Sequence, residues 1–178
     1  MARTKTIRRW RRNMDVTDDA QDDALFAAIE QQFGRLHFLL NAVAFADRAD
    51  LERPYVETSR DGFLKALDIS AYSLVSLARR AAPLMAKNGG GSIVTLSYLG
   101  AERVFPNYNV MGVAKAALEC SVRYLASELG PSNVRVNAVN PGSIATSILE
   151  NSMLKWPDRD LVHPEGAQLY TVKSAVSL

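Results

Sequence analysis

Residues 92–115 read SIVTLSYLGAERVFPNYNVMGVAK, and the rest of the chain is organised around this stretch. It opens with the apolar run 93–96, which is rich in β-branched residues and predicts a short buried strand. A loop that contains Tyr98 follows, and a helix is expected to begin near Asn107, a favoured N-cap residue. The stretch therefore predicts a strand, a loop and a helix in direct succession.

Tyr108 and Lys115 are the chemically notable pair on this predicted helix. Their separation is close to two helical turns, so both side chains are expected on one face. A neighbouring ammonium favours phenolate and is expected to lower the tyrosine pKa. A positioned phenol can also protonate or stabilise an oxyanion. The spacing alone favours a half-buried aromatic residue and a solvated lysine on an ordinary helix, because such pairs are common by chance.

The surrounding residues resemble the enoyl-acyl-carrier-protein reductases, a branch of the short-chain dehydrogenase/reductase superfamily. That branch has the pattern Tyr-x6-Lys with a second tyrosine ten residues upstream, which Tyr98, Tyr108 and Lys115 match. The commoner superfamily pattern is a catalytic serine followed by Tyr-x3-Lys. Here the residue four positions after the tyrosine is Gly112, so the common pattern is absent.

The resemblance covers about residues 15–146 and implies both a fold and an activity. The implied fold is α/β, a Rossmann-like doubly wound parallel sheet. The implied reaction is hydride transfer from NADH or NADPH to a trans-2-enoyl thioester on acyl carrier protein, in fatty acid biosynthesis. Tyr108 would stabilise the enolate oxygen, and Lys115 would hold the nicotinamide ribose. Tyr98 would line the thioester pocket or assist protonation.

The resemblance also implies where the dinucleotide and the acyl chain are bound. Asp15 is expected near the exocyclic amine of the adenine, a role compatible with capping the helix that follows. Ala46 would reach the acyl substrate, together with Tyr98 and Tyr108. The implied cofactor-binding residues are Asp15, Val16, Val43, Ala44, Leu96, Lys115, Pro141, Gly142, Ile144 and Thr146.

Three further segments have clear secondary-structure patterns. Residues 24–34 predict a helix that ends at Gly34. Residues 36–46 form a continuous apolar run, typical of a parallel strand covered on both faces, and end in small residues. Such residues allow a flat cofactor to approach or permit tight helix–sheet packing. Residues 58–86 predict a long helix, capped by Thr58 or Ser59 and apolar on more than one side.

Composition narrows the function classes. The net charge is +2 and 48% of the residues are hydrophobic, so the chain can form a core and is not a general polyanion binder. No apolar run approaches the ~18 residues that span a bilayer. The single cysteine, Cys120, fits a reducing, cytoplasmic compartment and is expected to be a buried structural thiol. His37 and His163 offer no metal-ligand spacing. Neither nucleic acid nor a membrane is expected as a partner.

The chain is expected to divide into three parts. Residues 1–14 predict a basic flexible tail, residues 15–150 a partial Rossmann-like domain, and residues 151–178 a divergent tail. The glycines at 89–91 follow a helix and precede a strand, so they predict a helix stop and not a phosphate loop. The resemblance implies that the sequence begins about where the family's third strand ends, and the sequence contains no glycine-rich loop for a pyrophosphate. The first strand is therefore expected to have a bare, long, apolar edge.

Three functional hypotheses stay open at this point. The first is the enoyl reductase, complete or truncated. The second is a 3-ketoacyl reductase of the same superfamily, which the sequence Asn140-Pro141-Gly142 supports. The third is an inactive fragment that acts at most as an oligomerisation partner. In the superfamily, helices equivalent to 58–86 and 107–129 build the homo-oligomer interface, so a dimer or tetramer is expected.

Overall fold

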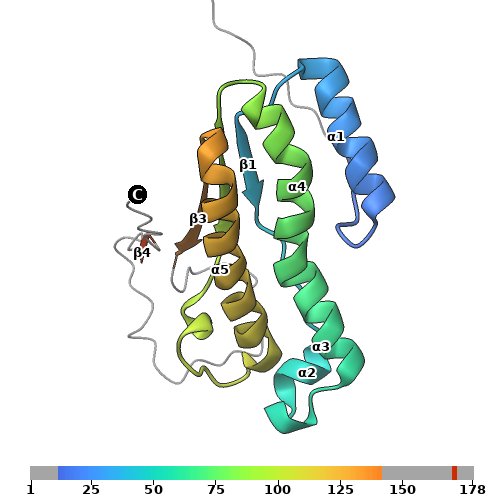
Figure 1. The fold of residues 1–178 in the computed structure, drawn as a ribbon. Helices are drawn as coiled ribbons and strands as arrows, with labels where there is room; N and C mark the ends of the chain where they lie inside the picture. The colour runs from blue at the N-terminus through green and yellow to red at the C-terminus, as the bar shows by residue number, and fades with distance from the viewer. Residues whose placement is uncertain (1–11, 142–169, 172–178) are drawn as a thin grey trace, which may run out of the picture.

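The structure, a computed structural model, describes residues 12–141 and 170–171 of the chain. Within these ranges, helices alternate with strands, and a layer of helices packs on a sheet (Figure 1). The α-helices are α1 (Asp19–Phe33), α2 (Arg48–Glu52), α3 (Arg60–Leu67), α4 (Ser73–Ala86) and α5 (Asn109–Leu129). The strands are β1 (Phe38–Asn41), β2 (Gly91–Leu96), β3 (Val134–Asn140) and β4 (Tyr170–Thr171). The predicted α/β class is confirmed.

The sheet has the strand order β1-β2-β3-β4. The first three strands are parallel, with Leu39 paired to Ile93 and Ile93 paired to Val136. β4 is antiparallel to β3. Because helices connect the parallel strands, the carboxyl ends of β1, β2 and β3 lie along one edge of the sheet. In open sheets of this kind, that edge is where ligands bind.

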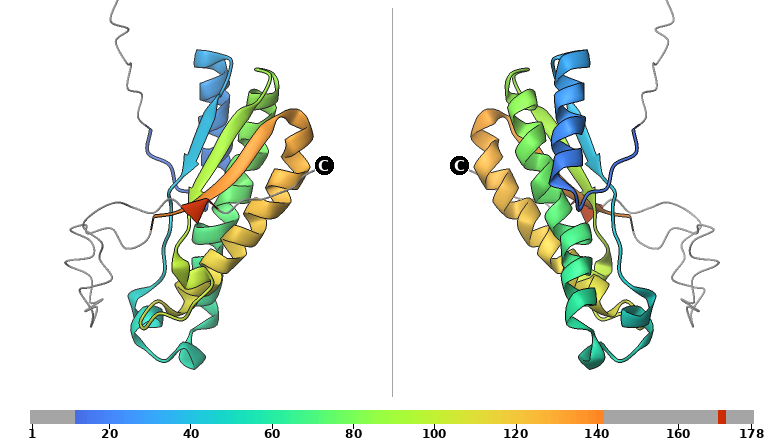
Figure 2. Two further views of the ribbon diagram at one scale, coloured as in Figure 1. Left: turned by 90° about the vertical axis from the view of Figure 1, so that its left-hand side faces the viewer. Right: turned by 90° about the vertical axis from the view of Figure 1, so that its right-hand side faces the viewer.

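The described helices α1, α4 and α5 all cover the same face of the sheet (Figure 2). The expectation that the first strand is covered on both faces is therefore wrong for the described residues. Phe38 is 53% exposed and Leu40 is 51% exposed, because alternate side chains of β1 point to the face away from these helices. β1 is also shorter than the predicted 36–46, with four residues in the sheet.

The core lies between the sheet and the helices α4 and α5. Its largest buried side chains come from both layers and are at most 2% exposed: Leu74, Met85, Ile93, Leu118 and Val136. Burial of a side chain of this size contributes roughly 1.5–3 kcal/mol. The core thus fixes α5 against the end of β2, which is where the candidate site lies.

The predicted helix 58–86 is helical from Arg60 to Ala86 and consists of three pieces. Ser59 caps α3 by accepting a hydrogen bond from the Gly62 amide, as predicted. A turn of π-helix, η2 (Asp68–Tyr72), then separates α3 from α4. Single π turns inside helices often mark functional sites. Here the turn carries Ser70, whose Oγ accepts from the Phe45 amide at 2.9 Å and donates to the Phe45 carbonyl at 3.0 Å.

The ends of α1 and α4 show which sequence signals the chain uses. Asp18, and not Asp15, caps α1 by accepting from two backbone amides of the first turn. The helix begins at Asp19, before the predicted residue 24, and its C-cap is Gly34 with φ +67°. The glycines at 89–91 are a helix stop, as predicted, since α4 ends at Ala86 and β2 begins at Gly91. An aspartate caps α1, as the sequence predicted, but the cap is Asp18 and the helix begins five residues earlier than expected.

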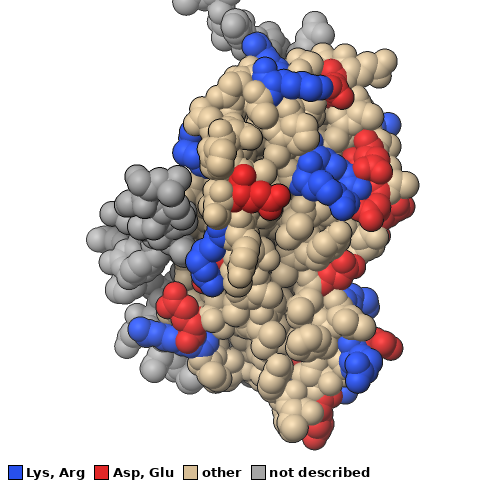
Figure 3. All heavy atoms as spheres, in the orientation of Figure 1, with Lys and Arg blue, Asp and Glu red and all other residues tan. Residues whose placement is uncertain are grey.

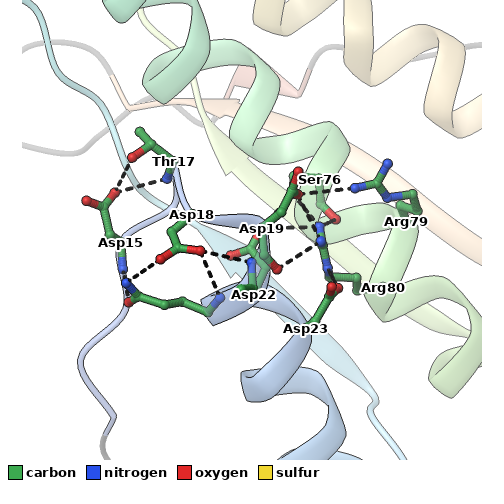
Figure 4. A network of polar contacts seen from close by, with 11 residues as sticks. Asp15, Thr17, Asp18, Asp19, Asp22, Asp23, Ser76, Arg79 and Arg80 are labelled. Atoms are coloured by element: carbon green, nitrogen blue, oxygen red, sulfur yellow. Dashed lines mark hydrogen bonds and ion pairs between the residues drawn. The ribbon is translucent and has the colours of Figure 1, made fainter.

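A cluster of charged residues joins α1 to α4 (Figure 4). Arg80 Nη2 lies 2.9 Å from Asp19 Oδ1, Nη1 lies 3.3 Å from Asp22 Oδ2, and Nε lies 2.5 Å from Asp23 Oδ1. The buried Asp22 also accepts a 2.6 Å hydrogen bond from Ser76 Oγ. In Figure 3, acidic and basic side chains lie next to one another on this side of the molecule, and further charged side chains are scattered over the rest of the view.

Two remaining expectations concern composition. Cys120 is free but only partly buried, so it is less enclosed than predicted. None of the helices in the described ranges is long and apolar enough to cross a membrane. The predictions for the segments 1–11, 142–169 and 172–178 lie outside the described residues.

Candidate active site

The candidate site lies where the carboxyl end of β2 meets the start of α5. The loop after β2 contains Tyr98 and the short 3₁₀ helix η3 (Leu99–Ala101), and it leads to Tyr108. The rings of Tyr98 and Tyr108 have centroids 4.8 Å apart and are tilted by 53°. Phe105 contacts Tyr98 from another side, with centroids 5.3 Å apart. The two tyrosines named by the sequence are thus brought into direct contact.

Tyr108 lies immediately before α5 and not within it, which corrects the predicted helix start. The helix begins at Asn109, and Asn107 and Asn109 both have positive φ values, of 60° and 40°. The Asn109 side chain donates hydrogen bonds to the carbonyls of Leu51 at 2.9 Å and Arg53 at 2.8 Å. Tyr108 is therefore positioned by this anchored turn and by ring packing, and not by the two-turn helical spacing.

Two glycines make room for the Tyr108 ring. A Cβ atom on Gly100 would lie 2.4 Å from Cδ1 of Tyr108, and one on Gly112 would lie 2.8 Å from the Gly100 carbonyl oxygen. Neither distance is compatible with a side chain unless the loop moves. A lysine at position 112, which the common Tyr-x3-Lys pattern requires, would therefore disrupt this packing. The spacing found in the sequence has a local steric reason.

The environment of Tyr108 keeps its phenol protonated. Burial raises the pKa of Tyr108 above its ordinary value, and electrostatic interaction with Tyr98 raises it further. The expectation that Lys115 lowers this pKa is therefore wrong, because desolvation of a phenolate outweighs any attraction from the ammonium. A neutral phenol is a hydrogen-bond donor, which is the form that can stabilise an oxyanion.

Lys115 is 6% exposed, and its ammonium faces the end of β2. Its Nζ donates a 2.7 Å hydrogen bond to the carbonyl oxygen of Leu96. Burial lowers the pKa of Lys115 to about 8, while the negative charge of Glu119 partly opposes this shift. The lysine is thus neither solvated nor in a described ion pair within 4 Å, and it retains two N–H donors beyond the bond to Leu96.

Ser97 and Glu119 also belong to this site, and neither was predicted from the sequence. Glu119 lies one turn after Lys115 on α5 and is 8% exposed. Ser97, 4% exposed, donates a short hydrogen bond from Oγ to Glu119 Oε1. A lysine and a glutamate four residues apart on a helix are a recognisable signal, and it would have identified Glu119. Nothing in the sequence links Ser97 to position 119.

A cavity of about 330 Å³ adjoins Tyr108 on the outer side of this loop. Its lining includes Tyr55, Phe105, Tyr108 and Val113. Tyr98 and Lys115 do not line it, so this cavity touches one member of the predicted trio. A ligand that contacts Lys115 therefore has to reach it from outside this cavity.

The segment after β1 forms the neighbouring part of this edge. Asn41 is buried, and its side chain accepts from the Val43 amide at 3.2 Å and donates to Ser73 Oγ at 3.1 Å. Val43 and Ala44 are exposed there, as a cofactor-binding surface requires, and Ala46 is partly buried. Together with Ser70 at Phe45, these bonds hold the segment rigidly beside β2.

The remaining predicted cofactor residues are spread along the same edge or lie outside the described ranges. Asp15 is exposed, and its Oδ1 accepts from the amide and the hydroxyl of Thr17, which lowers the pKa of Asp15. Val16 and Leu96 are partly buried, as is Pro141, the residue after β3. The other three, Gly142, Ile144 and Thr146, lie outside the described residues.

Comparisons with known proteins agree with this geometry. A family model described as enoyl-(acyl carrier protein) reductase matches residues 2–160. The NADH-dependent enoyl-[acyl-carrier-protein] reductase 1 of Rhizobium meliloti is 54% identical over 132 residues, which is 74% of this chain and 48% of the relative. The NADH-dependent enoyl-[acyl-carrier-protein] reductase FabI of Bacillus subtilis is 52% identical over 161 residues, 85% of this chain and 62% of the relative.

Solved structures show the same similarity. The enoyl-(acyl-carrier-protein) reductase of Anaplasma phagocytophilum, in complex with NAD, has a TM-score of 0.73 and 50% identity, with 75% of this chain and 50% of that chain covered. The Bacillus cereus enoyl-acyl carrier protein reductase, in complex with NADP+ and indole naphthyridinone, has a TM-score of 0.72 and 54% identity, with 74% and 51% covered.

The chain spans about half the length of most of these relatives. The match nevertheless includes the strand–loop–helix unit with Tyr98, Tyr108 and Lys115. With a family model that covers most of its residues, this chain belongs to the enoyl-(acyl carrier protein) reductase family.

Proposed function

We propose that this chain carries the phenol–lysine half of an NADH-dependent enoyl-acyl-carrier-protein reductase site. The substrate is a trans-2-enoyl thioester on acyl carrier protein, and the product is the saturated thioester. The observation that carries the proposal is the contact of Tyr98 with Tyr108 beside a buried Lys115 at the carboxyl end of β2. The family membership supports the substrate class.

The described residues fit two parts of a nicotinamide dinucleotide. Lys115 has N–H donors for the hydroxyls of the nicotinamide ribose, and the exposed Val43 and Ala44 follow the neighbouring parallel strand β1. Asp15 has a second carboxylate oxygen that no donor in the described ranges contacts, and this oxygen suits an adenine amine. Within residues 12–141, no glycine-rich loop joins a strand to a helix, so these residues supply no pyrophosphate cradle. When bound, the nicotinamide supplies the hydride.

The protein side of the reaction concerns the thioester oxygen. Addition of hydride to the β-carbon moves negative charge to this oxygen, and the protonated phenol of Tyr108 donates a hydrogen bond to it. Tyr98 holds the Tyr108 ring by direct packing and lines the space for the thioester. Ala46 faces the acyl chain from the segment after β1. The charged Lys115 holds the ribose and adds positive potential at the same edge.

Titration with NADH and turnover of crotonyl-acyl carrier protein test this proposal. We expect NADH to bind, and Tyr108→Phe and Lys115→Ala each to lower turnover by about 10²–10⁴-fold, the usual contribution of a positioned proton donor. Lys87→Ala is the matched control for Lys115→Ala, because Lys87 is exposed and lies away from the site. Unchanged turnover in the two site variants contradicts the assigned roles. Absence of NADH binding at millimolar concentration supports an inactive fragment instead.

Substrate choice separates the enoyl reductase from the 3-ketoacyl reductase alternative. Comparison of crotonyl and acetoacetyl thioesters under the same conditions is the measurement. The packing of Gly112 against the Gly100 carbonyl favours the enoyl substrate, because it excludes the lysine position of the commoner pattern. Faster turnover of acetoacetyl thioester contradicts the proposal.

The proposed function includes assembly through the helix layer. Leu64, Tyr72 and Tyr124 are 59%, 45% and 75% exposed on the helices predicted to form the interface. A groove between α4 and α5, with Val75, Ala82 and Leu125 in its lining, adds apolar surface. We expect a dimer or tetramer in sedimentation at micromolar concentration, and a monomer there contradicts this part of the proposal.

A further inference from the structure

The buried pair of Ser97 and Glu119 has no role in the function described so far. Both side chains are more than nine-tenths buried, and the short bond between them joins the residue after β2 to the middle of α5. Lys115 bonds to Leu96, the residue before Ser97, and lies one turn before Glu119. The two pairs therefore connect the same two elements side by side.

We propose that Glu119, held by Ser97, is a positioning residue that keeps the Lys115 ammonium charged and fixed against the Leu96 carbonyl. The inference rests on the proposed function, in which a charged Lys115 holds the ribose. Glu119 acts through Lys115 and contacts no substrate atom, so it is not a catalytic residue.

Burial of an ammonium has a large desolvation cost. A lysine nitrogen that leaves water loses its solvation, and the neutral amine becomes the more stable form. One carbonyl oxygen at 2.7 Å replaces only part of this solvation. Glu119 is the charged group whose field acts on Lys115 in the described structure, and its attraction favours the charged form. Tyr98 and Tyr108 are the other titratable groups on the flanking segments, and burial keeps Tyr108 neutral.

Ser97 allows the Glu119 carboxylate to be buried beside Lys115. A carboxylate that is taken out of water loses its solvation and needs hydrogen-bond donors from the protein in its place. The Ser97 hydroxyl donates to Oε1 and so replaces part of the solvation that the Glu119 carboxylate loses on burial. Because Ser97 follows β2 directly, it also fixes the distance of Glu119 from the strand that carries the Leu96 carbonyl. The serine thus supports the lysine only through the glutamate.

The protonation state of Lys115 in the full chain is the direct test. With ¹³C-labelled lysine, NMR signals of the side-chain Cε atoms follow each lysine through a pH titration, and Lys115→Arg assigns the signal. We expect Glu119→Gln to shift the protonation equilibrium of Lys115 about tenfold toward the neutral amine, so that its charged fraction at pH 8 falls from about half to about a tenth. Glu128→Gln is the matched control, because it is the same change on an exposed position of α5.

The serine variants make the test decisive. We expect Ser97→Ala to shift the same equilibrium in the same direction, Ser97→Thr to leave it unchanged, and Ser97→Ala to add nothing once Glu119 is Gln. If Glu119→Gln does not fold, as judged by circular dichroism, the comparison of Ser97→Ala with Ser97→Thr decides. A Lys115 titration midpoint that is the same in wild type, Glu119→Gln and Ser97→Ala overturns the proposal. This titration needs neither cofactor nor turnover, so its failure is distinct from failure of the proposed function.

Discussion

Two cations with little exposed surface, Arg80 and Lys115, have opposite surroundings. The Arg80 side chain is 10% exposed and contacts the carboxylates of Asp19, Asp22 and Asp23. Hydrogen bonds to these aspartates, first to Asp23, raise the pKa of Arg80. Lys115 is 6% exposed and bonds to a backbone carbonyl, and burial lowers its pKa to about 8.

This difference distinguishes a charge that holds two helices together from a charge that can bind a ligand or exchange a proton. All three nitrogens of the Arg80 guanidinium are in ion pairs, so it joins α1 to α4 and has little capacity for a ligand (Figure 4). Lys115 has one described acceptor and a near-neutral titration point, so it can still bind a group and change its protonation. A buried cation that retains unused donors indicates a functional site more strongly than one enclosed by carboxylates.

Arg80→Met should have the largest effect on stability. It leaves Asp19, Asp22 and Asp23 close together without their cation, and Asp22 is fully buried. We expect the free energy of unfolding in urea to fall by about 3–5 kcal/mol, as for other broken buried ion pairs. Arg79→Met is the control, with an expected loss of less than about 1 kcal/mol, since the Arg79 ion pair is exposed. Equal losses in the two variants would show that Arg80 stabilises the fold no more than the exposed Arg79 does.

Lys115→Met should change the pH dependence of stability. The folded state loses the Lys115 proton near pH 8, whereas the unfolded state keeps it to about pH 10.5. The unfolded state binds more protons in between, so the contribution of Lys115 to stability rises with pH across this window. We expect the unfolding free energy of wild type relative to Lys115→Met to increase by up to about 3 kcal/mol from pH 7 to pH 10. A flat difference would show that Lys115 is not desolvated.

Gly100→Ala tests how tightly the Tyr108 ring, in the same site as Lys115, is packed. The new methyl group would lie 2.4 Å from the Tyr108 ring, so the loop or the ring has to move. We expect a loss of about 1–3 kcal/mol in thermal or urea unfolding, typical of overpacking. Gly130→Ala is the control, because φ is −53° and no atom lies within 4 Å of its added Cβ. If Gly100→Ala behaves like Gly130→Ala, Tyr108 is loosely held.

The double variant Asp22→Leu with Arg80→Met should have the smallest effect. It removes the buried carboxylate together with its cation, and apolar side chains of similar size then fill the space between α1 and α4. We expect most of the Arg80→Met loss to be recovered, to within about 1 kcal/mol of wild type, because such pairs are often replaceable by packed apolar residues. No recovery in urea unfolding would show that Asp19 and Asp23 need Arg80 independently.

The residues of the site were largely predictable, but their arrangement was not. Tyr98, Tyr108 and Lys115 were identified from spacing and resemblance, and the structure brings the two tyrosines into contact beside the strand that binds the lysine. The predicted start of the helix was wrong by two residues, and the predicted direction of the Tyr108 pKa shift was wrong. Both errors arise from treating the pair as an isolated exposed helix, on which burial has no effect.

The order of helices and strands, the turn at residues 89–91 and the family were determined by the sequence alone. Periodicity, helix caps and glycine positions depend only on residues that are neighbours in the sequence. Tertiary structure alone decided that the helices of the described residues cover one face of the sheet, that Ser97 bonds to Glu119, and that Arg80 meets three aspartates. The protonation of Tyr108 and Lys115 was decided in the same way. Desolvation and long-range contacts depend on which surfaces meet, and no short stretch of sequence contains that information.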